Sequence, residues 1–184
     1  KNYTVAVGRQ NLSNALIATA FMVNSQQSAD YNRVAGGILN YKSKDKKWTS
    51  NFNYAKAFDS NIQSDEPGRN DFVNAEIDYQ TRTFEANLSF QNIGRNHVTH
   101  TRFTPELYQF DAKTNETTRE GFKVLYAKTQ LKHVHQKSKL VDWSRRFYFI
   151  NVSTFNVDNS LRDNFFFYSP FALRFRDRSY VYAT

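Results

Sequence analysis

Residues 71–93 alternate between apolar and polar side chains in two successive runs. The apolar side of these runs carries Val73, Ala75, Ile77 and Tyr79, then Phe84, Ala86, Leu88 and Phe90. The other side carries Phe72, Asn74, Glu76 and Asp78, then Glu85, Asn87, Ser89 and Gln91. Because successive side chains of a β-strand point to opposite faces of a sheet, a period of two predicts two strands, each with an apolar and a polar face. The short polar gap Thr81–Arg82 between the runs predicts a β-hairpin.

The same alternation recurs along most of the chain. Strand-like segments cover residues 1–10, 15–23, 31–43, 48–58, 71–80, 83–93, 119–131, 141–156, 163–175 and 179–184. Most are close to the 9–11 residues that a tilted strand needs to cross a bilayer. No segment has the period of a helix. The sequence therefore predicts an all-β fold, an antiparallel meander of about ten strands.

The first six gaps between these segments alternate in length. In chain order they are residues 11–14, 24–30, 44–47, 59–70, 81–82 and 93–118. Outer-membrane β-barrels connect their strands by short periplasmic turns and longer external loops. The alternation favours a transmembrane outer-membrane β-barrel, in which residues 95–117 lie outside the membrane.

Composition excludes one membrane architecture and leaves another open. The 184 residues are 40% hydrophobic with a mean hydropathy of −0.71, so no run of 18 apolar residues exists and a transmembrane helix is excluded. A barrel strand is half polar and passes this test. Aromatic residues make up 16% of the chain, and several lie near strand ends: Tyr3, Tyr31, Tyr41, Trp48, Tyr79 and Tyr180. Such positions fit the aromatic girdles of a barrel, although aromatic residues suit any half-buried pleated surface.

The net charge of +8 identifies no partner by itself. Basic residues are scattered over many segments, which is typical of solvated faces and loops. Arg145 and Arg146 precede three aromatic residues, a mixture found in proteins that bind single-stranded nucleic acid. Those aromatic residues continue the alternation of a strand, so we expect no nucleic-acid partner. If the charge lies mostly in a barrel lumen, it favours the passage of anions.

One cluster in the longest gap is a candidate ligand site. Arg95, His97, His100 and Arg102 lie close together in sequence, and histidines beside arginines can titrate near neutral pH or bind an anion. The alternative is a polar loop without a ligand.

Other candidate sites lack the required partners. Asp65, Glu66 and Asp111 lie in polar gaps, where carboxylates are usually solvated. His133 and His135 could share one face of a strand, but no third metal ligand is evident and the neighbouring lysines would repel a cation. The chain has no cysteine, no glycine-rich phosphate loop and no nucleophile elbow. We expect neither catalysis nor a cofactor nor a metal.

Three short segments resemble a known family. They are residues 2–9 (NYTVAVGR), 30–36 (DYNRVAG) and 102–107 (RFTPEL). They resemble motifs of Gram-negative envelope proteins of unassigned function, which join an N-terminal carbohydrate-binding domain similar to family 9 to a C-terminal outer-membrane β-barrel. In that family the first two motifs open successive barrel strands. The third lies in a loop and is usually followed by Gly-Phe, where this chain has Tyr108 and Gln109.

The resemblance implies that residues 1–184 are a single segment of the barrel of a longer protein in the bacterial outer membrane. Strand-like runs at both ends of the chain agree with this expectation. Such a protein would contact lipid and act as a channel for polar solutes or glycans, as a carrier of a surface domain, or as a component of an envelope complex. The alternative is a soluble β-sheet domain that binds carbohydrate through Trp48 and Tyr54.

Overall fold

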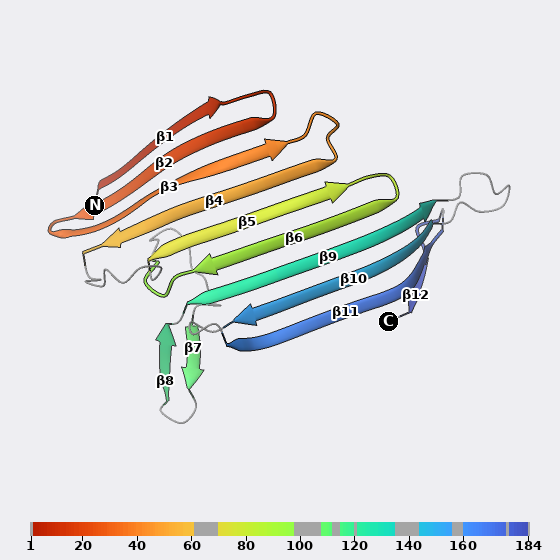
Figure 1. Cartoon of the computed structure of the whole chain (residues 1–184). Coiled ribbons are helices and arrows are strands. Elements are labelled where there is room, and N and C mark those ends of the chain that lie inside the picture. Colours follow the sequence, from red (N-terminus) through yellow and green to blue (C-terminus); the bar gives the residue numbers. More distant parts are fainter. Residues whose placement is uncertain are drawn as a thin grey trace.

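The computed structural model describes residues 2–60, 70–97, 108–111, 115–119, 121–134, 144–155, 160–175 and 177–183. In this part of the chain, ten antiparallel strands form one open sheet, and neighbours in the sheet follow the order of the sequence (Figure 1). These strands are β1 (Asn2–Asn11), β2 (Leu16–Gln27), β3 (Asp30–Lys42), β4 (Trp48–Asp59), β5 (Asp71–Gln80), β6 (Phe84–Ile93), β9 (Phe122–Val134), β10 (Ser144–Phe155), β11 (Leu161–Arg174) and β12 (Tyr180–Ala183). The all-β meander predicted from the sequence is confirmed.

The second connection is shorter than the sequence predicts. Residues 24–30 were expected to form a long gap, yet β2 continues to Gln27 and pairs with β3 as far as Asp30. Ser28 turns the chain with a positive φ of 54°. The polar run before it has the composition of a loop, but main-chain hydrogen bonds do not depend on side-chain polarity. The predicted alternation of short and long gaps is wrong at this connection.

The longest predicted gap contains a hairpin. Within residues 93–118, β7 (Tyr108–Asp111) pairs with β8 (Glu116–Arg119) as a separate two-stranded sheet. Asn115 lies in the turn with a φ of 55°. The expectation of a gap without strands is wrong here, because runs of four residues are too short to reveal a period of two.

The register of the strands assigns side chains to the two faces of the sheet. Residues directly opposite each other in an antiparallel pair share a face. One row across β4, β5, β6 and β9 consists of Phe52, Ala75, Phe90 and Leu125. The adjacent row, on the other face, consists of Asn53, Asn74, Gln91 and Val124. The faces predicted from the sequence for residues 71–93 are confirmed.

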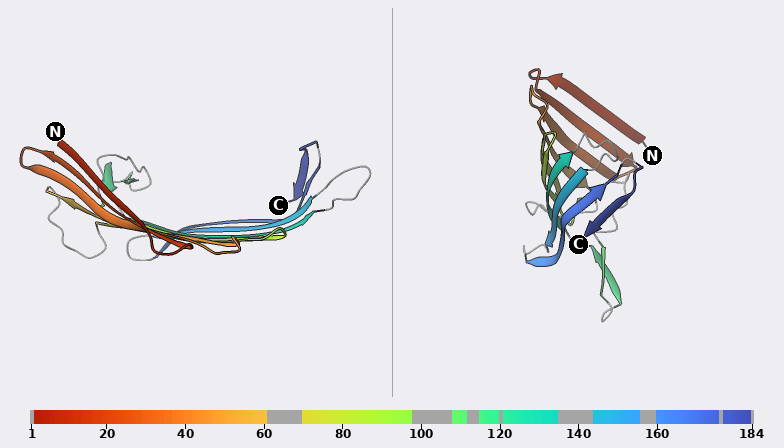
Figure 2. Two further views of the ribbon diagram at one scale, coloured as in Figure 1. Left: turned by 90° about the horizontal axis from the view of Figure 1, so that it is seen from above. Right: turned by 90° about the vertical axis from the view of Figure 1, so that its right-hand side faces the viewer.

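The sheet is a curved wall, and its outermost strands β1 and β12 bend toward the same side (Figure 2). We call the face that bears Phe52 and Phe90 the convex face, and the face that bears Asn53 and Gln91 the concave face. Extensive contacts between described strands occur only between hydrogen-bonded neighbours. Within the described residues, therefore, no second layer of strands covers either face of the large sheet.

A small apolar cluster lies on the concave face at β2–β5. Val34, Ala55 and Ala57 are buried, and Phe21 and Phe72 pack against them. The cluster forms because Gly36 leaves room: a Cβ atom there would lie 2.8 Å from Cζ of Phe21. The ring of Phe21 thus fills the place of the missing side chain, as aromatic residues often do beside a glycine in a sheet.

Polarity is not uniform along the concave face. It is polar on β4–β6, but β2 and β3 present Val23, Val34 and Ile38 there, and β10 presents Ile150 and Val152. The simple division into an apolar and a polar face therefore applies to the middle of the sheet. Toward both edges the concave face becomes apolar.

The aromatic residues near strand ends do not all share one face. Trp48, Tyr79, Tyr41 and Tyr31 lie on the convex face. Tyr3 and Tyr180 lie on the concave face. Tyr3 pairs with Ser25, which is on the concave face of β2. Tyr180 pairs with Arg174 of β11, and the partner of Arg174 on β10 belongs to the concave row. A girdle requires rings on a single face. The grouping of these six residues into girdles is therefore wrong for Tyr3 and Tyr180.

Candidate functional site

The middle of the concave face carries a ladder of polar side chains. Nδ2 of Asn51 donates to Oδ1 of Asn40 on the neighbouring strand at 2.7 Å. Nδ2 of Asn87 lies within hydrogen-bonding distance of both Glu76 and Asp78, at 2.8 and 2.6 Å. These contacts follow from the period of two, which places alternate polar residues of adjacent strands side by side.

A three-membered charge network continues this ladder. Glu85 accepts hydrogen bonds from Nζ of Lys128 at 2.7 Å and from Nζ of Lys132 at 2.8 Å. The three side chains are between 22% and 24% exposed, so they are less screened than surface pairs. The two lysines are four positions apart on β9. Both lie on the concave face, whereas Leu131 lies on the convex face. Each carboxylate oxygen therefore receives one ammonium group.

The strand register changes at the C-terminal edge of the sheet. On β10 and β11, Arg146 pairs with Ala172 but Tyr148 pairs with Ser169, so Pro170 and Phe171 together oppose the single residue Phe147. This is a β-bulge, a place where proline is tolerated because its missing N–H breaks no ladder bond. Because of the extra residue, Ala172 lies on the same face as Ser169, whereas residues three positions apart in a regular strand lie on opposite faces.

The change of face carries over to β12. Tyr182 pairs with Ala172, so the bulge brings Tyr180 and Tyr182 onto the concave face beside β10. The hydroxyl of Ser169, which is 1% exposed, lies 2.7 Å from the main-chain oxygen of Ala183. This hydrogen bond connects β12 to the bulge in β11.

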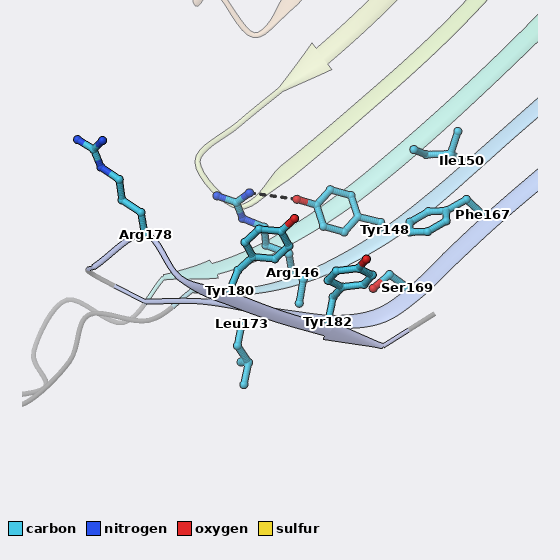
Figure 3. A pocket seen from close by; sticks show the side chains of 10 residues that line it. Arg146, Tyr148, Ile150, Phe167, Ser169, Leu173, Arg178, Tyr180 and Tyr182 are labelled. Carbon is cyan, nitrogen blue, oxygen red and sulfur yellow. Dashed lines mark hydrogen bonds between the residues drawn. The ribbon is translucent and has the colours of Figure 1, made fainter.

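The curled edge borders an open pocket of about 590 Å³ (Figure 3). Its lining comes from β10, β11, the turn before β12 and β12 itself: Arg146, Tyr148, Ile150, Phe167, Ser169, Ala172, Leu173, Arg178, Tyr180 and Tyr182. These lining residues include two arginines and no carboxylate. The pocket combines aromatic and aliphatic walls with two positively charged side chains, and small-molecule sites commonly combine apolar walls with a few polar or charged groups.

The two arginines are held differently. Nη1 of Arg146 donates to the hydroxyl of Tyr148 at 3.0 Å, whereas Nε of Arg146 is buried without a hydrogen-bond partner among the described residues. Arg178 is exposed in a tight turn with a φ of 73°. Asp177 stabilises this turn by accepting hydrogen bonds from the hydroxyl and from the main-chain N–H of Ser179, which lower the pKa of the Asp177 carboxyl.

The candidate ligand cluster of the long gap is described in part. Arg95 is exposed. His97 is buried: its Nδ1 lies 2.9 Å from the main-chain oxygen of Asn70, and its ring centroid lies 5.8 Å from that of Phe72. His100 and Arg102 lie outside the described residues. The structure therefore places His97 in the packing at the start of β5, and an anion-binding role for the cluster stays a prediction.

The other candidates are placed as follows. His133 is exposed on β9, and His135, Asp65 and Glu66 lie outside the described residues. In the part of the chain that the structure describes, no group of three or more His, Cys, Asp or Glu side chains could hold a metal ion. Trp48 and Tyr54 share the convex face, but they are six positions apart on β4, about 20 Å at the rise of a strand. They do not form one stacking platform for a sugar.

Sequence reasoning did not find the pocket. Residues 145–149 were interpreted as the continuation of a strand, which is correct for β10, but the partners of Arg146 on β12 depend on the bulge. One signal was present: Pro170 lies inside a strand-like run, and proline there commonly marks a bulge. Downstream of the bulge, odd- and even-numbered residues exchange faces. A sequence pattern with a strict period of two cannot predict this exchange.

The described part of the chain contains no helix long and apolar enough to span a membrane. Comparison of the chain with models of protein families, with curated protein sequences and with solved structures finds no match.

Proposed function

We propose that this chain forms part of the wall of a bacterial outer-membrane β-barrel, with the convex face against lipid and the concave face toward the lumen. The observation that carries the proposal is the exposed apolar surface of the convex face. Phe52 is 42%, Leu88 48% and Phe90 38% exposed in adjacent rows of β4 and β6. Contiguous apolar patches of this kind mark a surface that contacts lipid or another protein.

The boundaries of this surface support lipid as the contact. At one end of β4 and β5, the rings of Trp48 and Tyr79 lie side by side with centroids 4.5 Å apart. Toward the other end of the same strands, Lys56 lies directly opposite Asp71 in the strand register. An apolar band between aromatic side chains and charged residues is the expected pattern across a membrane.

Strand lengths support the same interpretation. Apart from the terminal β12, the strands of the large sheet contain between 10 and 14 residues. A tilted transmembrane strand needs about 9–11 residues. Main-chain groups in lipid must be paired, and the meander pairs each inner strand on both sides. An open sheet would gain the remaining pairs by closing into a barrel.

The concave face would then line the lumen. Its middle carries the hydrogen-bonded amides and the network of Glu85, which suit water and polar solutes. Its apolar flanks, including Phe21 and Phe167, suit the less polar part of a solute or a plugging segment. A channel, a carrier of a surface domain or a member of an envelope complex would each use this wall without catalysis.

Single-cysteine variants test which face contacts lipid. The chain has no cysteine, so each introduced thiol is unique. Leu88 and Ser89 are neighbours on β6 that point to the convex and the concave face. The variants L88C and S89C, carrying a polarity-sensitive fluorophore, would be folded into vesicles that contain brominated lipid.

Bromine quenches a fluorophore only at close range. We expect strong quenching at position 88 and weak quenching at position 89, with the same result for the pair F90C and Q91C. Equal quenching at both positions of a pair would reject the proposed faces. A folded, monodisperse chain in water without detergent would reject the membrane location and favour the soluble carbohydrate-binding domain.

A further inference from the structure

We propose that the pocket at the curled edge, between β10, β11 and β12, binds a small organic anion that has an apolar ring or chain. This inference goes beyond the barrel proposal and does not depend on it, because it follows from contacts within the last three strands of the sheet. The site is the pocket of about 590 Å³ lined by Arg146, Tyr148, Arg178 and Tyr182 among others.

The charge of the lining selects for an anion. Arg146 and Arg178 come from different elements, β10 and the turn before β12, and both line the pocket. Guanidinium groups remain charged at all physiological pH values. Because no carboxylate lines the pocket, an anion that enters would neutralise charge that the described lining residues leave uncompensated.

Arg146 also has a free hydrogen-bonding edge. Its Nη1 is engaged by the hydroxyl of Tyr148, while its buried Nε has no partner among the described residues. A buried donor without a partner costs about 1–3 kcal/mol. Nε and Nη2 together form the edge that binds a carboxylate or phosphate by two parallel hydrogen bonds. A rotation of the side chain would turn this edge into the pocket and satisfy Nε.

The walls select for an apolar body. The rings of Tyr180 and Tyr182 are stacked, with centroids 5.7 Å apart and an interplanar angle of 21°. Ile150 and Phe167 line the same pocket from β10 and β11. Tyr180 and Tyr182 are 65% and 55% exposed, which is apolar surface that a flat ligand would cover. Inorganic phosphate would use the arginines but leave these walls in water.

The bulge shows that the site depends on a specific local geometry. If the same sequence continued as a regular strand with no bulge, Ala172 and its partner Tyr182 would lie on the convex face, and Tyr180 with them. The buried hydroxyl of Ser169 holds the curled strand in place. Bulges often lie beside functional sites, where they redirect side chains.

The test compares two probes of nearly equal shape. The full chain, folded in a non-ionic detergent, is titrated calorimetrically with 1-naphthoate and with its neutral analogue 1-naphthamide, each corrected for partition into empty micelles. We expect 1-naphthoate to bind about tenfold more tightly, a difference of about 1.4 kcal/mol, and inorganic phosphate to bind more weakly than 1-naphthoate.

Three variants locate the site. Arg146→Gln should reduce the preference for 1-naphthoate to about twofold or less, as expected when one charged partner is removed. Arg178→Asn should reduce it too, and asparagine tolerates the positive φ of this turn. The matched control is Arg162→Gln, because Arg162 lies on β11, pairs with Asp163 and does not line the pocket. It should leave both affinities unchanged.

Equal affinity for the two probes, no binding of 1-naphthoate, or an unchanged preference in both Arg146→Gln and Arg178→Asn would overturn the proposal. Since Arg178 is exposed in a turn, its variant should fold even if Arg146→Gln does not. The outcome is also separate from that of the lipid-quenching experiment, because binding is measured in detergent and makes no use of the convex face.

Discussion

Phe21 on β2 lies directly opposite Gly36 on β3, and its ring occupies the space that a side chain at position 36 would need. On the other side of Gly36 the main chain of β4 approaches closely, with Cα of Ala55 2.9 Å from the place of a Cβ atom. A methyl group there would meet main-chain atoms that cannot rotate away. The close packing of β2 and β4 on either side of β3 therefore requires glycine at position 36.

The first prediction concerns this contact. Gly36→Ala should lower the free energy of unfolding by about 1–3 kcal/mol, the usual cost of overpacking. The next residue provides a matched control: a Cβ atom on Gly37 would meet only the main-chain oxygen of Thr19, at 3.5 Å. Gly37→Ala should be neutral or stabilising. Urea titration of both variants in detergent measures the difference, and equal stability would contradict the packing described for β2–β4.

The second prediction concerns the turn between β3 and β4. Asp45 accepts hydrogen bonds from the hydroxyl of Ser43 at 2.6 Å and from the main-chain N–H of Lys47 at 3.2 Å, and it pairs with the Lys47 ammonium. These contacts lower the pKa of Asp45 from 3.8 to about 2. The turn should therefore be stabilised by the carboxylate above pH 3.8 and lose this contribution as the pH falls toward 2.

An NMR titration of the Asp45 carboxyl carbon measures this pKa directly. Because the Ser43 hydroxyl is the largest cause of the shift, Ser43→Ala should raise the pKa of Asp45 toward its ordinary value. Ser179→Ala is the control, since it should raise the pKa of Asp177 and leave that of Asp45 unchanged. If Ser43→Ala does not move the pKa of Asp45, the turn geometry is incorrect.

The third prediction concerns Glu85. Glu85→Gln would leave Lys128 and Lys132 with like charges and weakened partners, so the free energy of unfolding should fall by about 1–3 kcal/mol. Asp163→Asn is the control, because its side chain is 75% exposed in the pair with Arg162, and exposed pairs contribute about 0–1 kcal/mol. Equal effects would show that the network is as solvated as a surface pair.

The same variant tests the proposed lumen. Removing the negative charge of Glu85 should shift the reversal potential of a conducting barrel further toward anions. Planar-bilayer recordings of the full-length protein in a salt gradient measure this shift. A shift toward cations would contradict the placement of Glu85 on the lumenal face.

The fourth prediction concerns Trp48 and Tyr79. Their rings pack across β4 and β5, so a double-mutant cycle with Trp48→Leu and Tyr79→Leu should give a coupling of about 0.5–1.5 kcal/mol. Phe58 lies on the same face of β4 but ten positions from Trp48. A cycle between Trp48 and Phe58 should give no coupling. Coupling of similar size in both cycles would indicate that the substitutions destabilise the whole sheet and do not report a specific contact between Trp48 and Tyr79.

The sequence was sufficient to predict the sheet. Wherever a strand has one apolar and one polar face, as from Val73 to Tyr79, the period of two gives both the strand and its faces. The end of β2 was missed because its last residues, including Gln26 and Gln27, are polar on both faces. The hairpin of β7 and β8 was missed because each strand has only four residues.

The candidate site was harder to predict than the fold. His97 stands in the sequence beside Arg95 as a candidate ligand, but the packing of Phe72 and the main-chain oxygen of Asn70 bury it. Arg146 was recognised only as part of a strand. Its role in the pocket depends on residues about thirty positions later in the chain, which a local pattern cannot connect.

The bulge at Pro170 and Phe171 adds one residue to β11 and so exchanges the faces of odd- and even-numbered positions. From Asp163 to Ser169 the odd-numbered residues of β11 lie on the concave face, and after the bulge the even-numbered ones do. A deletion of one residue anywhere in a regular strand turns all later side chains of that strand to the wrong side. At this point the native chain already contains the inserted residue, so deletion of Pro170 would place Ala172 two positions after Ser169, restore the strict alternation and leave both tyrosines of β12 on the concave face.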